Sequence, residues 1–459
     1  MANDKQRKVA REVARLGEVF RRHGKLLYLV GGPVRDLLLG RPSHDLDLTT
    51  DAVPAEVKGL AREVGAEAIY TVGERFGTIG LVLDGHRVEI TTFRAEQYEP
   101  ASRKPAVTFG TALVDDLARR DFTINAMAQD ALTGEVVDPY GGMADLVAHV
   151  VRAVGEPAER FAEDPLRLLR AVRFSVQLDF AIAPETMEGI RAAAPTLANI
   201  SRERVAEEMN RILLSPSPGH GVRLLAELGL LDQIIPEMRE MQAMDQGPHH
   251  HKDVFEHTLL VVDRVEADLP LRWAALLHDI AKPRTVSFEG GEVHFWGHEH
   301  LGEQMSRAIL SRLRLDRTTI DIVAKLVRMH LRANQYDDDW TDGAVRRLMR
   351  EAGDDLWRLF SLSRADVTSH RPVRVEAALS RVAALEARCR ELAERESVQA
   401  LQSPLDGNEL MALFGRPPGP WIRPVKDYLL ALVIEGDLGQ EEKERAAALA
   451  REYVAEHGL

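Results

Sequence analysis

Near the N-terminus, apolar residues occur in short runs and in strict alternation with polar residues. Leu26–Val30 is a brief apolar run that ends at Gly31-Gly32, and this pattern predicts a buried strand. In segment 45–49 aspartates alternate with leucines, so both aspartates share one face of a second strand. Segment 87–91 alternates in the same way. These patterns predict a small sheet with one polar face.

Two connections in this region have opposite character. Asp84-Gly85 lies between two β-rich runs, which is a strong signal for a two-residue hairpin turn. Segment 93–110 is polar, carries two prolines and has no periodicity. We therefore expect a mobile loop beside the polar face of the sheet.

Beyond about residue 150 the apolar positions recur every three or four residues, which is typical of helices. A helix is also expected over residues 4–22. The predicted fold class is α+β: a small mixed or antiparallel sheet forms a head, and the remainder is all-helical. A chain of 459 residues is too long for one core. The expected domains are a head at 1–150, a helical neck and body at 151–245, a histidine-containing domain at 246–375 and a helical tail at 376–459.

The composition is that of an ordinary globular protein, with 45% hydrophobic and 29% charged residues. No apolar run approaches the roughly 18 residues of a membrane helix, and the N-terminal segment lacks the apolar core of a signal peptide. The single cysteine, Cys389, permits no disulfide within the chain and fits a reducing compartment. We expect a cytoplasmic protein without a membrane partner.

A net charge of −13 argues at first against a nucleic-acid partner, because phosphate binding depends on Lys and Arg. Local charge differs from net charge, however. Five arginines gather around the segments described next: Arg119, Arg120, Arg167, Arg170 and Arg173. We therefore expect modest RNA affinity and fast product release.

The segment from Leu26 to Thr50 carries the first candidate chemistry. Gly31 and Gly32 let the backbone approach a ligand at the start of a short helix, where anions bind, and Arg35 projects as a phosphate partner. Residues two apart on a strand are about 6.6 Å apart, so the carboxylates of Asp45 and Asp47 can converge on a shared pair of Mg²⁺ ions. Glu89, on the polar face of the neighbouring hairpin, is a candidate third carboxylate.

The string GGPVRDLLLGRPSHDLDLTT, residues 31–50, resembles the signature of the polymerase-β-like superfamily, specifically class II tRNA nucleotidyltransferases and bacterial poly(A) polymerases. The resemblance implies a palm-type catalytic head with Mg²⁺ at the two aspartates. Residues 119–126, RRDFTINA, match a second motif of this family. That match implies Arg120 on the phosphates and Asp121 and Asn125 around the ribose.

A third motif begins at Glu163 with the sequence EDPLRLLRAVRF. Arg167, Arg170 and Arg173 follow one another at i, i+3 and i+6 and are expected on one polar face of a core-packed helix. A carboxylate and a guanidinium one turn apart can read base edges, since Asp accepts from an exocyclic amine and Arg donates to ring acceptors. In the resembled family EDxxR is the protein template that selects CTP and ATP. The resemblance thus implies this role for Asp164 and Arg167, with the two later arginines helping to hold the nucleotide.

Most histidines occur in the next region. His257, His278-Asp279 and Asp366 lie on expected helices and form a mixed nitrogen and oxygen set that suits Mn, Ni, Fe or Mg ions. Their order resembles the HD phosphohydrolase domain, which implies a second divalent metal and hydrolysis of 2′,3′-cyclic phosphates or other phosphoesters. His298 and His330 are additional candidate ligands. The surface or core alternative is preferred for His300 and for the run 249–251.

The resulting hypothesis is an enzyme that adds CCA to the 3′ end of tRNA from CTP and ATP. Three alternatives stay open: an enzyme adding only A or only CC, a poly(A) polymerase, and an HD phosphohydrolase whose head binds RNA. The acidic net charge and the lack of a basic C-terminal extension disfavour the poly(A) polymerase, and the intact aspartate pair disfavours the phosphohydrolase alternative. In the resembled family, enzymes adding only C are shortened at the loop corresponding to 93–110. The full-length loop therefore favours addition of A. The tail is expected to contact the tRNA elbow or a second subunit, and the sequence gives no oligomeric state.

Overall fold

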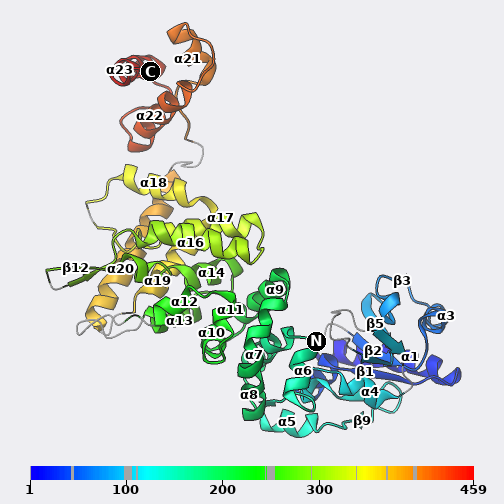
Figure 1. Cartoon of the computed structure of the whole chain (residues 1–459). Helices are drawn as coiled ribbons and strands as arrows, with labels where there is room; N and C mark the ends of the chain where they lie inside the picture. The colour runs from blue at the N-terminus through cyan, green and yellow to red at the C-terminus, as the bar shows by residue number, and fades with distance from the viewer. Residues whose placement is uncertain are drawn as a thin grey trace. The chain divides into compact units, whose positions relative to one another are not determined.

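The computed structural model forms two compact units, Met1–Pro236 and Glu237–Leu459 (Figure 1). It describes residues 2–42, 46–97, 106–109, 112–242, 244, 254–290, 292–337, 339–368, 371–395 and 401–459. The histidine run 249–251 lies outside these residues. Among the described residues, no helix combines the length and the apolar character that crossing a bilayer requires.

A mixed sheet of seven strands forms the head, in the order β3-β4-β5-β2-β1-β8-β9. Its strands are β1 Leu27–Val30, β2 Leu46–Thr50, β3 Ala68–Tyr70, β4 Thr78–Leu83, β5 His86–Thr92, β8 Ala128–Asp130 and β9 Val136–Val137. Only β2 and β5 pair in parallel, and the other neighbours are antiparallel. The expected mixed sheet is therefore present, and β2 and β1, which carry the first motif, lie near its centre.

Helices α1 (Ala2–Arg22) and α3 (Pro54–Val64) pack against this sheet. α3 starts with proline in its first turn and with Glu56 bonding back to the amide of Val53 at 3.0 Å, and it ends at a left-handed Gly65. Its apolar stripe packs beside the buried side of β4, where alternate residues are buried. Burial of one face of the sheet leaves the other face for polar chemistry.

The Asp84-Gly85 turn has the predicted geometry. Leu83 pairs with His86, and both turn residues have positive φ, 47° and 81°, as a two-residue hairpin of the primed type requires. The prediction of a loop over residues 93–110 is wrong at both ends of this segment. There β6 (Arg94–Gln97) and β7 (Ala106–Phe109) pair as antiparallel strands, because ladder hydrogen bonds between backbones do not need an apolar period.

The remainder of the first unit is mostly helical, and within it α7 (Leu166–Leu178) packs on α6, α9 and α10. Eleven of the thirteen residues of α7 are buried, so the predicted polar face of this helix is wrong. Its arginines form ion pairs inside the unit instead of facing solvent. The other elements of this part of the unit are α2 Gly32–Leu38, α4 Leu113–Ala118, η2 Thr123–Asn125, α5 Gly142–Ala148, β10 Val150–Val151, α6 Pro157–Glu163, β11 Ala181–Ile182, α8 Pro184–Ala193, η3 Ala194–Asn199, α9 Arg202–Leu213, α10 Pro218–Glu227 and α11 Leu231–Ile234.

The second unit is a helical bundle around α14 (Leu269–Leu277), which packs on α13, α17 and α19. Apart from Arg272, α14 is apolar, and its Trp273 is fully buried, as expected of a central helix. The other elements of the bundle are α12 Met238–Gln242, α13 Val254–Arg264, α15 Lys282–Thr285, β12 Ser287–Glu289, β13 Glu292–His294, α16 His298–Arg312, α17 Arg317–Met329, α18 Asp342–Ala352, η4 Gly353–Asp355, α19 Leu356–Asp366 and α20 Pro372–Arg395.

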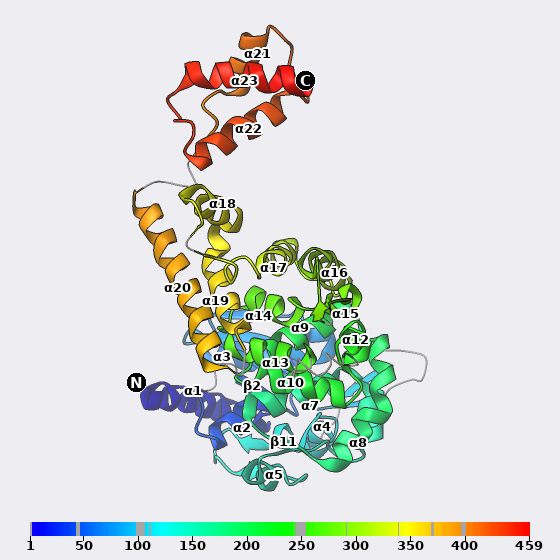
Figure 2. The ribbon, with the colours of Figure 1, turned by 90° about the vertical axis from the view of Figure 1, so that its left-hand side faces the viewer.

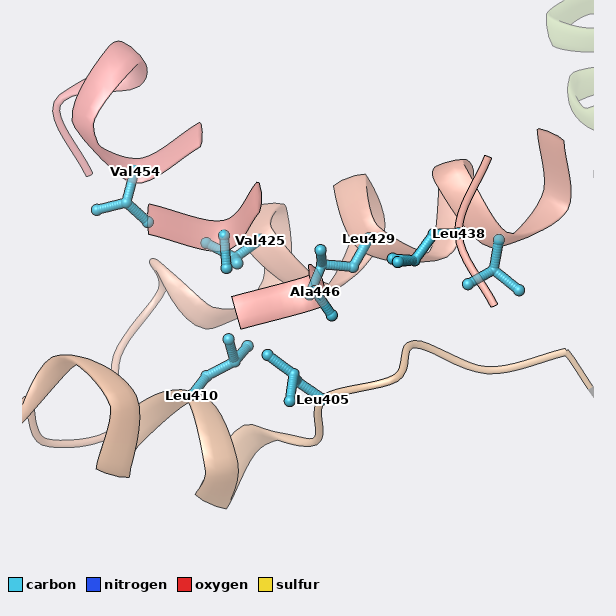
Figure 3. Packing of buried hydrophobic residues seen from close by; sticks show 9 residues of the cluster. Leu405, Leu410, Val425, Leu429, Leu438, Ala446 and Val454 are labelled. Carbon is cyan, nitrogen blue, oxygen red and sulfur yellow. The ribbon is translucent and has the colours of Figure 1, made fainter. Parts of the chain in front are cut away.

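The last three helices, α21 (Gly407–Phe414), α22 (Ile422–Glu435) and α23 (Lys443–His457), enclose a small core of their own (Figure 3). Leu410 and Leu429 are fully buried in it. A capping box of Asp406 and Glu409 starts α21. The predicted helical tail is thus present.

Candidate functional site

Two carboxylates lie side by side on the polar face of the head sheet. Asp47 on β2 is the direct partner of Glu89 on β5 in the parallel register, and both side chains are exposed while their neighbours Leu46 and Ile90 are buried. Paired positions on adjacent strands are about 4.8 Å apart, which suits two oxygen donors to one divalent ion. Asp45, the other predicted metal ligand, lies outside the described residues.

The glycine turn next to these carboxylates receives an arginine. Gly31 has φ of 75°, and a Cβ built on it would lie 2.6 Å from Nη1 of Arg120. Glycine is therefore required both by the backbone conformation and by the approach of the guanidinium. Gly32 follows as the first residue of α2. Burial lowers the pKa of Arg120 more than Asp116 raises it, which marks Arg120 as a cation that gains from an incoming anion.

A hydrogen-bonded network joins the second motif to α2 and α7. Buried Asp121 accepts from Nδ2 of Asn125 at 3.2 Å and from Nε of Arg170 at 2.7 Å, and Oδ1 of Asn125 accepts from Nη1 of Arg35 at 2.8 Å. Burial acts to raise the pKa of Asp121, but the charge and hydrogen bond of Arg170 and the Asn125 amide leave this pKa below its usual value. The network fixes an ionised carboxylate and two guanidinium groups next to Arg120.

One aromatic ring sits among the arginines. The guanidinium carbons of Arg35, Arg170 and Arg173 lie 5.2, 5.3 and 4.4 Å from the centre of the Phe174 ring. Phe122 packs edge-on against the same ring at 5.7 Å between centroids. Each such cation–π contact contributes roughly 0.5–1 kcal/mol at partly exposed sites. Phe174 therefore orients side chains from α2 and α7, although the sequence analysis did not single it out.

The residues of the third motif are each held by a specific partner. Arg167 bonds Glu163 at 2.6 Å and donates to the carbonyl of Arg119 at 2.7 Å. Asp164 accepts from the amide of Leu166 at 3.0 Å and from Arg204 at 2.9 Å. Both side chains thus have fixed orientations at the end of α7 that faces the head.

Arg173 lies farther along α7 and has a different partner. It pairs with Glu208 of α9 at 3.2 Å, and both side chains are almost fully buried. Burial lowers the pKa of Arg173 to about 10, partly offset by Glu208. The Arg173–Glu208 pair therefore connects two helices, whereas Arg170 points to Asp121.

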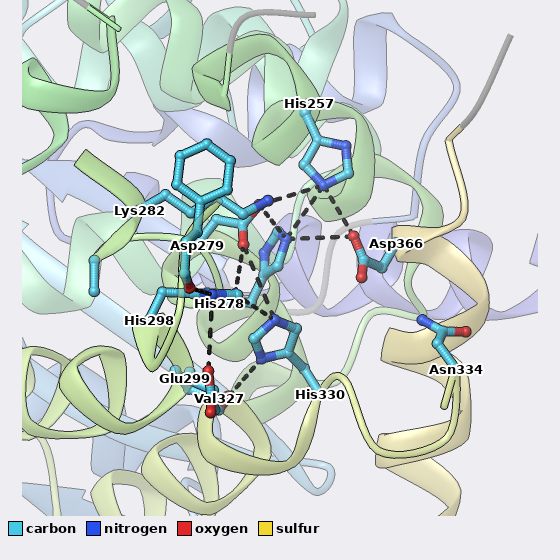
Figure 4. Close-up of polar contacts among 12 residues, drawn as sticks. His257, His278, Asp279, Lys282, His298, Glu299, Val327, His330, Asn334 and Asp366 are labelled. Atoms are coloured by element: carbon cyan, nitrogen blue, oxygen red, sulfur yellow. Dashed lines mark hydrogen bonds and ion pairs between the residues drawn. The ribbon is translucent and has the colours of Figure 1, made fainter. Parts of the chain in front are cut away.

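A second cluster lies in the second unit and draws on five segments (Figure 4). His257 is on α13, His298 is the first residue of α16, and Asp366 is the last residue of α19. His278 and Asp279 follow α14, and His330 follows α17. The chain thus gathers six potential ligands, including the two histidines predicted as additional candidates.

The six side chains form two groups of potential metal ligands, His257, His278 and Asp366 in one, and Asp279, His298 and His330 in the other. In the first group, Nε2 of His257 lies 2.9 Å from Oδ1 of Asp366 and 3.3 Å from Nε2 of His278. In the second, Nε2 of His298 lies 3.2 Å from Nε2 of His330.

Asp279 links the two groups. Its Oδ2 is 3.1 Å from Nε2 of His278, and its Oδ1 is 3.5 Å from Nε2 of His298. Lys282 also bonds Oδ2 at 2.6 Å, while Oδ1 is buried without a hydrogen bond among the described residues. A carboxylate with one oxygen toward each group is placed to bridge two cations.

The imidazoles are oriented as metal ligands usually are. Nδ1 of His278, His298 and His330 donates to the carbonyl three residues earlier, at 2.8, 2.7 and 2.5 Å. Nδ1 of His257 bonds the hydroxyl of Thr368 at 2.7 Å. These bonds direct each Nε2 to the centre, as in metal sites with a supporting outer shell.

The charges within this cluster also favour the binding of cations. Burial acts to lower the pKa of His278, but Asp279 and Asp366 raise it to about 10. Burial lowers the pKa of His330 to about 4. The two carboxylates therefore draw positive charge to one side of the cluster and leave a neutral imidazole on the other. Mixed imidazole and carboxylate donors of this kind bind divalent metal ions.

His300, on the same helix as His298, behaves as predicted. The His300 side chain is 71% exposed and belongs to neither ligand group, in agreement with the surface interpretation.

Together, these features define a nucleotidyltransferase of the polymerase-β-like class followed by an HD-type metal domain. Family models agree: the poly A polymerase head domain matches residues 27–152, the probable RNA and SrmB-binding site of polymerase A matches 179–241, and the HD domain matches 254–370. The families of the head and of the HD domain both use divalent metals.

Similar proteins cover almost the whole chain. The A-adding tRNA nucleotidyltransferase of Deinococcus radiodurans is 37% identical over 91% of this chain and 94% of its own length. The CCA-adding enzyme of Geobacillus thermodenitrificans is 34% identical over 93% of both. The crystal structure of the Bacillus stearothermophilus CCA-adding enzyme in complex with CTP matches with a TM-score of 0.67, 31% identity and 98% coverage of both chains. The chain belongs to the tRNA nucleotidyltransferase family, which confirms the predicted class, enzyme type and α+β fold.

Proposed function

We propose that this chain adds CCA to the 3′ end of tRNA, with CTP and ATP as the nucleotide substrates. The observation that carries the proposal is the network in which Asp121 and Asn125 bind Arg35 of α2 and Arg170 of α7. This network connects the phosphate-binding turn to the helix that bears the base-selecting motif. The CTP complex of the similar Bacillus enzyme supports the same assignment.

In the proposed reaction, the 3′-hydroxyl of the RNA gives up its proton to solvent and attacks the α-phosphate. A new P–O bond forms, the bond between the α-phosphorus and the bridging oxygen breaks, and pyrophosphate leaves with that oxygen. Asp47 and Glu89, together with Asp45, would hold Mg²⁺. The bound Mg²⁺ ions supply activation of the hydroxyl and stabilisation of the leaving group. Arg120 and the amides at Gly31-Gly32 hold the triphosphate.

Asp164 and Arg167 select the base in this proposal. Cytosine and adenine both present an amine donor beside a ring-nitrogen acceptor, and a carboxylate with a guanidinium one turn away matches that pattern. The bond from Arg167 to Glu163 and that from Arg204 to Asp164 fix the two groups before a nucleotide arrives. Preorganisation of this kind replaces a nucleic-acid template. Arg170 and Arg173 support this site, Arg170 through Asp121 and Arg173 through the packing of α7 on α9.

Addition of A alone is the second candidate for the head, because the Deinococcus relative, at 37% identity, carries that name. One experiment separates the candidates. Purified protein receives tRNA ending at the discriminator base and, in a parallel reaction, tRNA ending in CC, each with Mg²⁺ and labelled CTP and ATP. Three added nucleotides support CCA addition, whereas labelling only of tRNA that already ends in CC supports addition of A. An extended A tail would identify a poly(A) polymerase, and a stop after CC a CC-adding enzyme.

For the second unit we propose a metal-dependent phosphohydrolase that acts on phosphoesters at RNA ends, 2′,3′-cyclic phosphates included. The observation in favour is the division of six potential ligands into two groups of three, with Asp279 of one group also contacting His278 of the other. Such a set would hold two divalent ions of Mn, Ni, Fe or Mg, which supply an activated water molecule. Water adds to phosphorus, one P–O bond of the cyclic ester breaks, and the released oxygen takes the proton.

These assignments correspond to a proposed division into a head at 1–150, a neck and body at 151–245, an HD domain at 246–375 and a tail at 376–459. We also propose that the enzyme acts in the cytoplasm, which the single reduced cysteine supports. Cell fractionation that follows the endogenous protein alongside markers of each compartment tests this placement.

A further inference from the structure

A pocket of about 870 Å³ lies between α13, the end of α19 and the first half of α20. Figure 2 shows α19 and α20 running side by side. The pocket is lined by Arg264, Arg364, Val367, Thr368, Pro372, Val375, Glu376, Leu379, Ser380 and Ala383. This volume falls in the range of roughly 300–1,000 Å³ that small ligands such as nucleotides occupy.

One wall of the pocket is apolar. Val375, Leu379 and Ala383 follow one another at four-residue spacing, so they form a stripe along α20. Leu379 remains 37% exposed, and Ala383 is exposed as well. A flat apolar surface of this kind suits the face of a nucleobase.

A second element that lines the pocket, α13, contributes a cation. Nη1 of Arg264 donates to the carbonyls of Ala365 at 3.4 Å and Val367 at 2.9 Å. These bonds hold the side chain, yet Arg264 pairs with no carboxylate of the described residues. Arg364 differs, since it pairs with Glu386 at 2.8 Å. Arg264 therefore offers an anchored positive charge that can bind a phosphate oxygen.

The pocket adjoins the accessible side of the metal-ligand cluster. Thr368 lines the pocket and bonds Nδ1 of His257, and Val367 directly follows Asp366. The side chains of His257 and Asp366 are 11% and 16% exposed, whereas those of His278 and Asp279 are 0% and 1% exposed. The two ligands that solvent reaches are thus those joined to pocket residues.

We propose that this pocket is the nucleoside subsite of the HD centre. It binds the terminal ribonucleoside of an RNA end, with the base on the apolar stripe of α20 and a phosphate oxygen at Arg264. The reactive phosphoester then lies at the His257–Asp366 side of the cluster. This inference rests on the proposed phosphohydrolase function and specifies its substrate as a nucleotide, in contrast to a simple phosphoester.

The test compares two cyclic phosphates that share the reactive five-membered ring, adenosine 2′,3′-cyclic phosphate and glycerol 1,2-cyclic phosphate, with the metal-loaded full-length protein. Ala383→Trp fills the pocket from an exposed helix position. It is expected to lower kcat/KM for the nucleotide by about tenfold or more and to leave that for the glycerol ester within about twofold. Ala377→Trp is the matched control, because Ala377 is an exposed alanine of the same helix outside the pocket.

Equal losses with both substrates, or no loss with either, would overturn the proposal. If the metal-loaded wild-type protein hydrolyses neither ester, the phosphohydrolase function fails, and the pocket is then judged by binding alone. Equilibrium dialysis with labelled adenosine 3′-monophosphate serves this purpose, in chains that also carry Arg120→Ala to weaken the head site. Loss of binding with Ala383→Trp but not with Ala377→Trp supports the subsite, and unchanged binding contradicts it.

Discussion

The head and the HD centre arrange charge in opposite ways. In the head, Asp47 and Glu89 are exposed on a sheet, and the cations around them are arginines paired with their own partners. In the HD centre, the carboxylate of Asp279 is almost fully buried, and three of the four histidines are buried with it. An exposed pair of carboxylates would exchange metal with each nucleotide, whereas a buried carboxylate between two ligand groups would retain bound ions. The contrast suggests a substrate-borne metal in the head and resident metals in the second unit.

Asp47→Asn tests the separation of the two centres with the largest expected effect. Nucleotide addition should fall by roughly 10³-fold, since metal stabilisation of a phosphoryl transition state amounts to several kcal/mol. Cyclic-phosphate hydrolysis should stay unchanged. Asp279→Asn should give the reverse pattern. Both rates are measured on the same preparations, and a variant that loses both activities while remaining folded would contradict two independent centres.

His330→Ala tests the resident metals. The variant removes one of three ligands from the group that contains His298 and Asp279, so bound metal should fall from two ions per chain to one. Elemental analysis after gel filtration gives the count. His300→Ala is the control, since that side chain is exposed and outside both groups, and it should retain two ions. One ion per chain in the wild-type protein would refute the bridged arrangement.

Glu208→Ala examines the buried pair on α7. Removal of the carboxylate leaves Arg173 charged and without its partner, which costs about 3–5 kcal/mol in comparable buried pairs. The double variant Arg173→Met with Glu208→Leu should recover most of this stability. Thermal unfolding and the KM for CTP are measured together. If the double variant is stable but binds CTP much more weakly, Arg173 contacts the nucleotide directly.

Phe174→Leu should have the smallest effect. The substitution keeps an apolar side chain of similar burial and removes three cation–π contacts, so KM for CTP and ATP should rise by about three- to tenfold. Phe174→Tyr preserves the ring and should behave like the wild-type protein. An unchanged KM with the leucine variant would show that the ring fills space without orienting the arginines.

The sequence predicted the parts of the molecule that short segments encode. The Asp84-Gly85 turn, the polar face that carries Glu89, and the helix after Gly32 all depend on neighbours within a few residues. The order of the candidate metal ligands along the chain could also be predicted, because each of them lies on a short segment with its own recognisable pattern.

Features that depend on distant partners were not predictable. The surroundings of α7 make Arg167 and Arg173 buried, yet a pattern analysis treats arginine as solvent-facing. The partner of Arg173 is Glu208 on another helix, and the bridging position of Asp279 requires helices that start far apart in the chain. Pairing of β6 with β7 arises from backbone hydrogen bonds, which leave little trace in side-chain pattern.

The central claim is that protein side chains at Asp164 and Arg167 select the incoming base. A crystal structure of this protein with CTP and Mg²⁺ tests it most directly. The account predicts the cytosine amine within hydrogen-bond distance of the Asp164 carboxylate and the ring acceptors facing the Arg167 guanidinium. A cytosine bound away from both residues, with its triphosphate still at Arg120, would contradict it.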